Sequence, residues 1–306
     1  MEIYLPIAEI SVNWIMILGM GAAVGFISGM FGLGGGFLMT PMLVFYGVPP
    51  AIAVGTEAPV IAAASISGAL SRWRVGAIDI KMGAVMLSGG LLGSLAGVQI
   101  FALLQSLGQI EFVVTAGYVL LLGSIGTLML NESIRVILAA RRGTPQAIGK
   151  RAQHNWVHGL PLRARFRRSK LYISVIPPAF LGLTVGILAA ILGVGGGFIM
   201  IPAMIYLLRM PTNVVVGTSQ FQILFVTAAT TVLHAITNQT VDLTLAMLLI
   251  IGGVAGVQWG VRVGSRLPGE QLRALLGILV VLVAGRLLIE LVTSPADIYS
   301  IVVGAQ

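Results

Sequence analysis

The sequence contains no cysteine and little charge. The absence of cysteine among its 306 residues excludes disulfides, thiol catalysis and cysteine-ligated metal sites. Charged residues make up 9% of the chain, whereas soluble domains carry about 25%. The metalloprotease motif HExxH, the hydrolase motif GxSxG and paired intramembrane aspartates are also missing. We therefore expect no enzyme, no metal site and no cofactor.

What is abundant is apolar sequence. Hydrophobic residues make up 57% of the chain and the mean hydropathy is +1.01, which predicts an all-α integral membrane protein that crosses the cell membrane several times. Most apolar segments are about 20 residues long, enough to span the hydrocarbon as a helix. The predicted segments are residues 13–30, 37–47, 52–71, 80–101, 111–130, 172–191, 198–208, 214–236, 243–262 and 272–293.

The second half of the chain repeats the first. Three strings recur in the same order, shifted by 161 to 163 positions. They are FGLGGGFLMTP (31–41) with LGVGGGFIMIP (192–202), VGTE (54–57) with VGTS (216–219), and GGLLG (89–93) with GGVAG (252–256). Three matches at nearly one shift indicate an internal duplication.

Each half carries three consecutive glycines within an apolar segment. Glycine holds a helix poorly and adopts positive φ easily, so each triplet is predicted to break a helix and expose backbone N–H groups. The short segment that follows would restart a helix, whose N-terminus attracts anions. Broken helices at matching positions of two repeats indicate a transport site, although glycines also allow close helix packing. The glycines of this predicted site are Gly34, Gly35, Gly36, Gly195, Gly196 and Gly197.

The pattern GxGGGxxxxP at residues 32–41 and 193–202, each time followed by a Gly-Thr-Ser-like element, resembles the TauE/SafE family. The resemblance covers nearly the whole chain except the central polar loop. It implies a membrane permease linked to the export of sulfite and organosulfonates. The first half departs from the pattern at Glu57, where the second half has Ser219.

Basic and neutral turns alternate along the chain. Lys and Arg lie in or beside residues 72–81, 131–170 and 263–272 and are absent from residues 102–110 and 236–242. Because basic turns stay in the cytoplasm, the two halves would have opposite orientations, with both termini outside. This predicts two inverted-topology repeats of about five helical segments each, with glycine-broken, short helices.

The predicted boundaries place the first transmembrane repeat at residues 1–131, a basic cytoplasmic loop at 132–171 and the second repeat at 172–306. The net charge of +8 gathers in the loop, which is expected to touch anionic lipid and not nucleic acid. The expected partners are thus membrane lipid and a small anionic substrate, and a homo-oligomer is left open.

Polar side chains at the start of the third segment of each half are further candidates. Glu57 would be an ionisable group at membrane depth that couples transport to a proton, or a residue at the outer interface in contact with water. Hydroxyls and amides nearby would bind an oxyanion without a net charge, or would cap helices and bond between them. These candidates are Thr56, Thr218, Ser219, Gln220 and Gln222.

These features favour a secondary transporter for a small anion, sulfite or an organosulfonate by the family resemblance, that works by alternating access with proton coupling. The alternative from another class is an anion channel with a glycine-lined filter.

Overall fold

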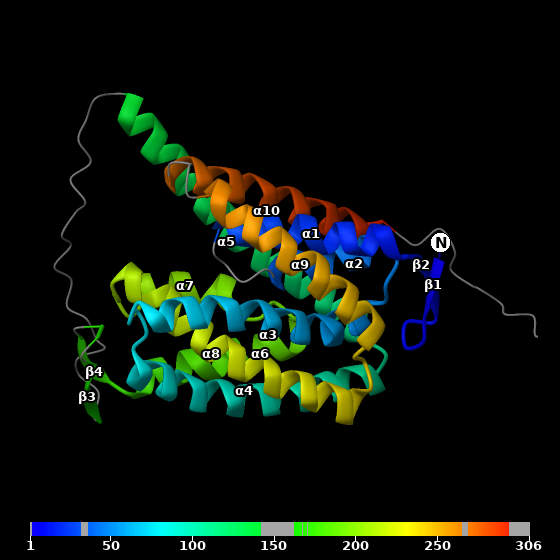
Figure 1. Cartoon of the computed structure of the whole chain (residues 1–306), viewed down its shortest axis with the longest axis horizontal. Helices are drawn as coiled ribbons and strands as arrows, with labels where there is room; N and C mark the ends of the chain where they lie inside the picture. The colour runs from blue at the N-terminus through cyan, green and yellow to red at the C-terminus, as the bar shows by residue number, and fades with distance from the viewer. Residues whose placement is uncertain are drawn as a thin grey trace, which may run out of the picture.

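The computed structural model describes residues 2–31, 36–141, 162–166, 168–169, 171–264 and 269–293. They form a bundle of helices with two short hairpins (Figure 1). The first half holds β1 (Glu2–Leu5), β2 (Ile10–Asn13), α1 (Trp14–Phe31), α2 (Gly36–Phe45), α3 (Pro50–Arg74), α4 (Ile80–Ser106) and α5 (Ile110–Arg141). The second half holds β3 (Arg163–Phe166), β4 (Leu171–Ser174), α6 (Ile176–Leu192), α7 (Gly197–Tyr206), α8 (Thr212–Leu233), the π-helical turn η2 (His234–Asn238), α9 (Leu243–Gly264) and α10 (Gly269–Val292).

Among the described helices, seven are long and apolar enough to cross a membrane: α1, α3, α4, α5, α8, α9 and α10. The prediction of an all-α, multi-pass membrane protein is therefore confirmed. Helices α2 and α7 have 10 residues each, or about 15 Å at 1.5 Å per residue. They reach about half-way through a bilayer core of about 30 Å, as expected for the short segments.

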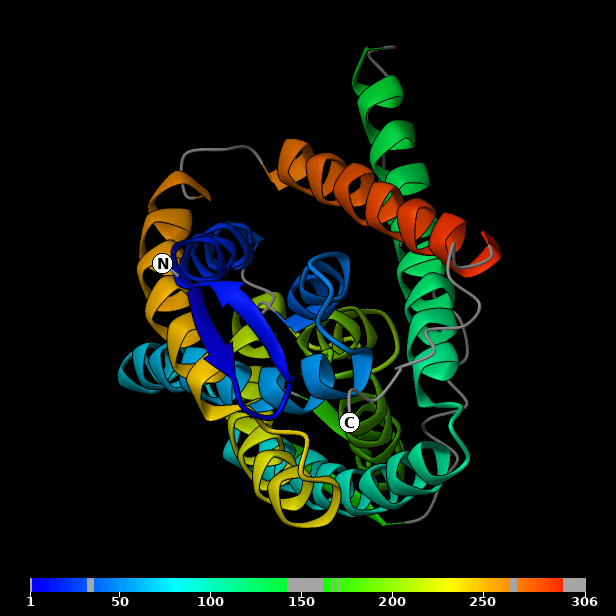
Figure 2. The same cartoon turned by 90° about the vertical axis from the view of Figure 1, so that its right-hand side faces the viewer.

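The helices of one half pack against those of the other. Helix α1 lies along α9, and α6, which corresponds to α1, lies along α4, which corresponds to α9. Helix α3 crosses its own counterpart α8, and α5 packs against its counterpart α10. Helices α4 and α10 lie on opposite faces of the molecule, with α3 between them (Figures 1 and 2). The core is therefore built from matching contacts between the two halves.

Glycines make this pairing possible. A Cβ atom on Gly256 of α9 would overlap the carbonyl oxygen of Ala22 in α1. Its counterpart Gly93 in α4 would meet the carbonyl oxygen of Leu183 in α6 in the same way. Because membrane helices attract one another mainly through close packing, small residues at such interfaces let the backbones approach.

Two aspartates join the hairpins to the helices. Asp79 caps α4 by accepting the Met82 N–H at 3.2 Å, and its other oxygen accepts the N–H and hydroxyl of Ser169, between β3 and β4, at 2.9 and 2.8 Å. Asp242 caps α9 by accepting the Leu245 N–H at 3.0 Å. Its other oxygen accepts an N–H from the turn between β1 and β2 at 3.2 Å. The two hairpins thus make matching contacts, and they lie at opposite ends of the bundle (Figure 1).

The segment 131–170, expected to be a polar loop, is partly regular structure. Helix α5 continues to Arg141, and β3 pairs with β4. In β3 the apolar side chains alternate with arginines, and Phe166 is 1% exposed. A four-residue strand is too short to be recognised by this alternation. The middle of the segment, residues 142–161, lies outside the described residues.

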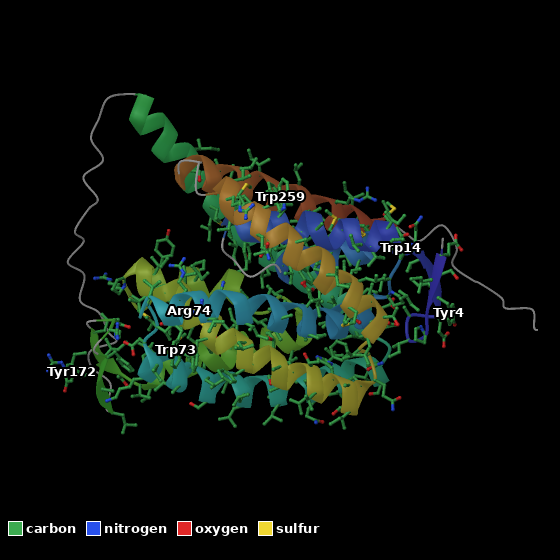
Figure 3. All side chains as sticks on the ribbon, in the orientation of Figure 1. Tyr4, Trp14, Trp73, Arg74, Tyr172 and Trp259 are labelled. Carbon is green, nitrogen blue, oxygen red and sulfur yellow. The ribbon has the colours of Figure 1, made fainter. Side chains whose placement is uncertain are left out.

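Exposed aromatic side chains mark both ends of the bundle. Tyr4 lies at the end that carries β1 and β2, and Trp73 and Tyr172 lie at the end that carries β3 and β4 (Figure 3). Tyr and Trp collect at the two interfaces of a membrane, so this arrangement fits a bilayer whose surfaces cross the two ends.

Candidate functional site

The second glycine stretch breaks the chain between two helices. Helix α6 ends at Leu192, and Gly193 closes it with φ 73°. Gly195 and Gly196 have φ values of 67° and 79°, and α7 begins at Gly197. These positive φ values are rare for residues with a Cβ atom, so the expected break in the second half is confirmed.

In the first half, α1 ends at Phe31 and α2 begins at Gly36. Gly34 and Gly35, two of the predicted site residues, lie outside the described residues. The rings of Phe37 and Phe198, each the second residue of its short helix, stack with centroids 4.6 Å apart. The first turns of α2 and α7 therefore meet each other.

Apolar side chains cover the glycines of the second break. A Cβ atom on Gly195 would lie 2.6 Å from a methyl carbon of Ile61, and one on Gly196 would lie 2.5 Å from a methyl carbon of Val185. Their assignment to the substrate site, like that of Gly197, stays a prediction.

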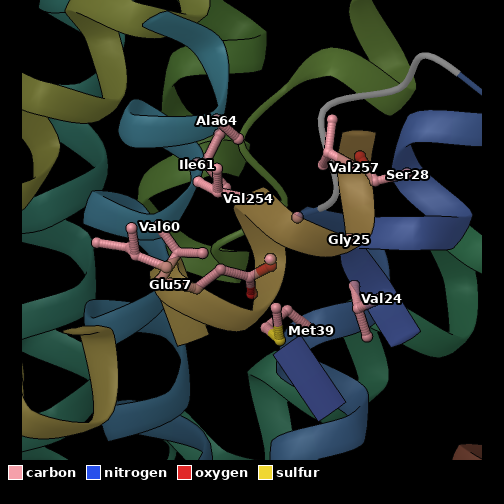
Figure 4. A pocket seen from close by; sticks show the side chains of 13 residues that line it. Val24, Gly25, Ser28, Met39, Glu57, Val60, Ile61, Ala64, Val254 and Val257 are labelled. Atoms are coloured by element: carbon pink, nitrogen blue, oxygen red, sulfur yellow. The ribbon is translucent and has the colours of Figure 1, made fainter. Parts of the chain in front are cut away.

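Glu57 lies inside the bundle. Its side chain is 0% exposed, which excludes the alternative of a water-contacting residue at the outer interface. The carboxyl group borders a cavity of about 30 Å³, the space of roughly one to three water molecules. The cavity is lined almost wholly by apolar side chains (Figure 4). Besides Glu57, its polar side chain is Ser28, and it also reaches Gly36 at the start of α2.

The Glu57 carboxyl group has an incomplete set of partners. Thr40 of α2 donates its hydroxyl to Oε2, whereas Oε1 has no hydrogen-bond partner. The Tyr118 hydroxyl of α5 lies near Thr40 and Glu57 but makes no hydrogen bond of regular geometry. A buried charge without full pairing is costly, and a proton on Oε1 would remove that charge.

A larger cavity of about 700 Å³ opens beside the small one, and we name it the basic vestibule. Three residues border both spaces: Ser28, Ala64 and Val257. The exposed side chains of Arg72 and Arg262 line the vestibule. The basic vestibule therefore leads from a positively charged surface toward Glu57.

The two predicted threonines bond between helices. Thr56 accepts the N–H of Asp242 at 3.0 Å and donates to the Thr240 carbonyl at 3.3 Å. Thr218 accepts the N–H of Asp79 at 3.0 Å. Each hydroxyl thus anchors the turn before a helix of the other half, which is the structural alternative that the sequence left open.

Two of the other polar candidates on α8, Ser219 and Gln220, have different surroundings. Ser219 is 0% exposed and donates to the Val216 carbonyl of its own helix at 3.1 Å. Gln220 lines the basic vestibule, where its amide lies against Gly68 and its Oε1 has no partner. The structure therefore brings Gln220 close to the path toward Glu57.

Sequence reasoning missed Thr40, Tyr118 and Ser28. Thr40 follows the glycine triplet by one helical turn, so a hydroxyl at that spacing within an apolar segment was a usable signal. Tyr118 lies on α5, far along the chain, and its approach to Glu57 depends on how α3 and α5 pack.

Comparisons with known proteins agree with this architecture. The family model described as "Sulfite exporter TauE/SafE" matches residues 17–287. The chain is 27% identical over 286 residues to "Probable membrane transporter protein YunE" of Bacillus subtilis, which covers 91% of this chain and 98% of that protein. It is 30% identical over 274 residues to a "Probable membrane transporter protein" of Xylella fastidiosa strain Temecula1, and the matched residues make up 88% of this chain and 93% of that protein.

A further relative is "Probable membrane transporter protein YjnA" of Bacillus subtilis, 27% identical over 278 residues, 90% of this chain and 99% of that protein. No solved structure matches the chain. The family model covers most of the sequence, from the first membrane helix into the last. The chain therefore belongs to the TauE/SafE family of membrane transporters.

Proposed function

We propose that this transporter carries a small anion, sulfite or an organosulfonate, by alternating access with proton coupling through Glu57. The observation that carries the proposal is the basic vestibule leading to a buried carboxyl group. The description of the family model supports the substrate class, and the two cavities support the mechanism.

The basic vestibule would collect the anion. The exposed guanidinium groups of Arg72 and Arg262 line its walls, and the Gln220 and Gln258 amides add hydrogen-bond donors. Positive charge in a concave site raises the local concentration of anions and speeds their entry. The neutral amide of Gln220, which is half-buried, would hold the anion without trapping it.

The centre is closed to the substrate in this conformation. The cavity beside Glu57 has room for roughly one to three water molecules, too little for a sulfonate. Transport therefore needs a movement that opens the centre. The matching pairs α1–α9 and α6–α4 are two similar units for such a movement, and rocking of one against the other would alternate access.

Two features support the proposed inversion of the two repeats. The two hairpins, which hold matching contacts to Asp79 and Asp242, lie at opposite ends of the bundle (Figure 1). The short helices α2 and α7 meet at their first turns. In the cell membrane, the end that carries Arg72, β3 and β4 would be cytoplasmic and both termini outside. Single cysteines at Ser106 and Asn238 should then be labelled by an impermeant reagent from outside, and labelling from the cytoplasm alone would remove the inversion.

Glu57 is the proposed coupling group. It is buried, one of its oxygens has no partner, and its cavity adjoins the basic vestibule. A proton that reaches Oε1 would neutralise the group and lower the cost of keeping it buried. The charge of the carboxyl group would thus change when the path to it opens and closes.

Flux into liposomes tests the proposal. The purified protein should take up sulfite, taurine or methanesulfonate with saturation, and unlabelled substrate inside should accelerate the entry of labelled substrate. Such counterflow is a property of a carrier. Uptake that stays linear with concentration and shows no counterflow would favour the channel, and no uptake of any sulfur oxyanion would overturn the substrate class.

A further inference from the structure

The duplication relates the cavity beside Glu57 to a second, equivalent place, and each place is built from helices of both halves. The strings that define the duplication give a shift of 162 for α3 and α8 and of 163 for α4 and α9. Three residues that line the Glu57 cavity are Glu57 itself, Val60 and Val257. Their counterparts are, in the same order, Ser219, Gln222 and Ser94.

The backbone around the two places is built alike. A Cβ atom on Gly25 of α1 would overlap the carbonyl oxygen of Gly253 in α9, beside the Glu57 cavity. The counterpart Gly186 of α6 would overlap the carbonyl oxygen of Gly90 in α4 in the same way. The two places therefore have the same helix contacts and differ in side chains.

The counterpart cluster is buried and polar. Ser94 and Ser219 are 0% exposed and Gln222 is 1% exposed. The Gln222 amide nitrogen lies 2.6 Å from where a Cβ atom on Gly90 would be. Ser94 lies one helical turn further along the same face of α4.

Two polar atoms of this cluster have no partner. The Gln222 Oε1 and the Ser94 Oγ are buried and make no hydrogen bond. Unpaired polar atoms in a protein interior cost stability and call for an explanation, such as a bound ligand. The fold does not need polar side chains here, because the equivalent positions beside Glu57 hold the apolar residues Val60 and Val257.

Helix α7 packs against α8, and by the correspondence with α2 its first turn would add positive potential at the counterpart cluster. Gly36, at the start of α2, borders the Glu57 cavity, and its counterpart Gly197 starts α7. An anion is favoured beside a helix N-terminus. In the first half the protein supplies this anion as the Glu57 carboxylate, whereas the second half has Ser219 and no carboxylate at that position.

We propose that Ser94, Ser219 and Gln222, together with the first turn of α7, form the site that binds the transported oxyanion. The inference rests on the proposed function and specifies its binding site. The Ser94 hydroxyl and the Gln222 amide would donate hydrogen bonds to sulfite or sulfonate oxygens, and rotation of the Gln222 amide would exchange its Oε1 and Nε2. The Ser219 hydroxyl would donate as well after turning away from the Val216 carbonyl. Gln220, which lines the basic vestibule, follows Ser219 directly, so the vestibule reaches the same turn of α8.

With this site, the proton and the anion would bind at different places in the protein. The proton would bind at Glu57 and the anion at the counterpart position, so the two ligands would use equivalent places in the two repeats. Both places lie where α3 and α8 pack against each other and against neighbouring helices. A single movement of these helices would therefore change access to both places.

Binding of sulfite and methanesulfonate to the purified protein in detergent tests the site. Gln222→Val, which installs the residue of the first half, and Ser94→Ala should each raise the Kd at least tenfold, or about 1.4 kcal/mol. Both variants should keep the melting temperature of the wild type, because each removes an unpaired buried group. Ser65→Ala is the matched control, since Ser65 is also a buried serine with an unpaired hydroxyl, and its Kd should not change.

Ser219→Glu gives a second, independent arm. It would place a carboxylate at the counterpart of Glu57 and should abolish anion binding by occupying the site. Wild-type Kd values in folded Gln222→Val and Ser94→Ala would overturn the inference and leave the proposed function standing. If the wild type itself binds neither probe, the proposed function fails first.

Discussion

At the start of α3 and of α8, the two halves of the chain carry the same Gly-Thr pair and then diverge. Thr56 and Thr218 make matching hydrogen bonds to the turns before α9 and α4. The next residues are Glu57 in one half and Ser219 in the other. The shared threonines thus maintain the packing between the halves, and we propose that the residues that differ carry separate chemistry.

The same division holds deeper in the bundle. The glycines along α4 and α9 occur in both halves and touch the backbones of α6 and α1. Of the two central places, the one beside Glu57 has Val60 and Val257 at the positions that are equivalent to Gln222 and Ser94 at the other. Substitutions at shared positions should therefore act alike in the two halves, and substitutions at differing positions should not.

The largest effect is expected at the shared glycines. Gly93→Val and Gly256→Val should each destabilise the protein by about 3 kcal/mol, the upper end of the usual cost of overpacking, because the side chain would overlap a backbone carbonyl of the neighbouring helix. Detergent-resistant yield and thermal unfolding measure this loss. Gly285→Val is the control, since nothing lies within 4 Å of a Cβ atom there. Normal stability of either glycine variant would break the equivalence of the two halves.

A smaller effect is expected at the shared threonines. Thr56→Val and Thr218→Val should each cost about 1–3 kcal/mol, because each leaves a buried backbone N–H without its acceptor. If their role is structural, the Kd for sulfite should stay unchanged in both variants. A tenfold higher Kd at normal stability would instead indicate that these hydroxyls bind the substrate.

The smallest effect is expected at the mouth of the basic vestibule. Arg72→Gln should slow the initial rate of anion uptake roughly two- to tenfold at low salt, with little effect at high salt, because exposed charges attract at long range only when unscreened. Arg74→Gln on the same helix end is the matched control, because Arg74 does not line the vestibule. If both variants slow anion uptake equally, the effect comes from the overall surface charge and not from the basic vestibule.

The sequence was sufficient to predict the helices. Apolar runs and their length located each membrane segment, and the glycine triplet predicted the break before α7, because positive φ at Gly195 and Gly196 is what glycine permits. Asp79 and Asp242 each lie just before a helix and cap α4 and α9, which is the position where aspartate is favoured by local sequence preference alone.

The contacts between the halves could not be predicted in the same way. Nothing local in α1 indicates that it packs on α9 and not on α4, because both carry glycine faces. The hairpins were missed because strands of four residues give too short an alternation. The proximity of Tyr118 to Glu57 and the burial of Ser94 depend on this packing, so they required the structure.

The central proposal is that Glu57 is the coupling group. Transport by the wild type and by Glu57→Gln, each reconstituted in liposomes under an imposed pH gradient, tests this role directly. The wild type should accumulate labelled methanesulfonate above its equilibrium concentration while the gradient lasts. Glu57→Gln should keep the shape of the side chain and the Thr40 contact, still exchange substrate in counterflow, and show no accumulation. Accumulation by Glu57→Gln equal to that of the wild type would contradict the account.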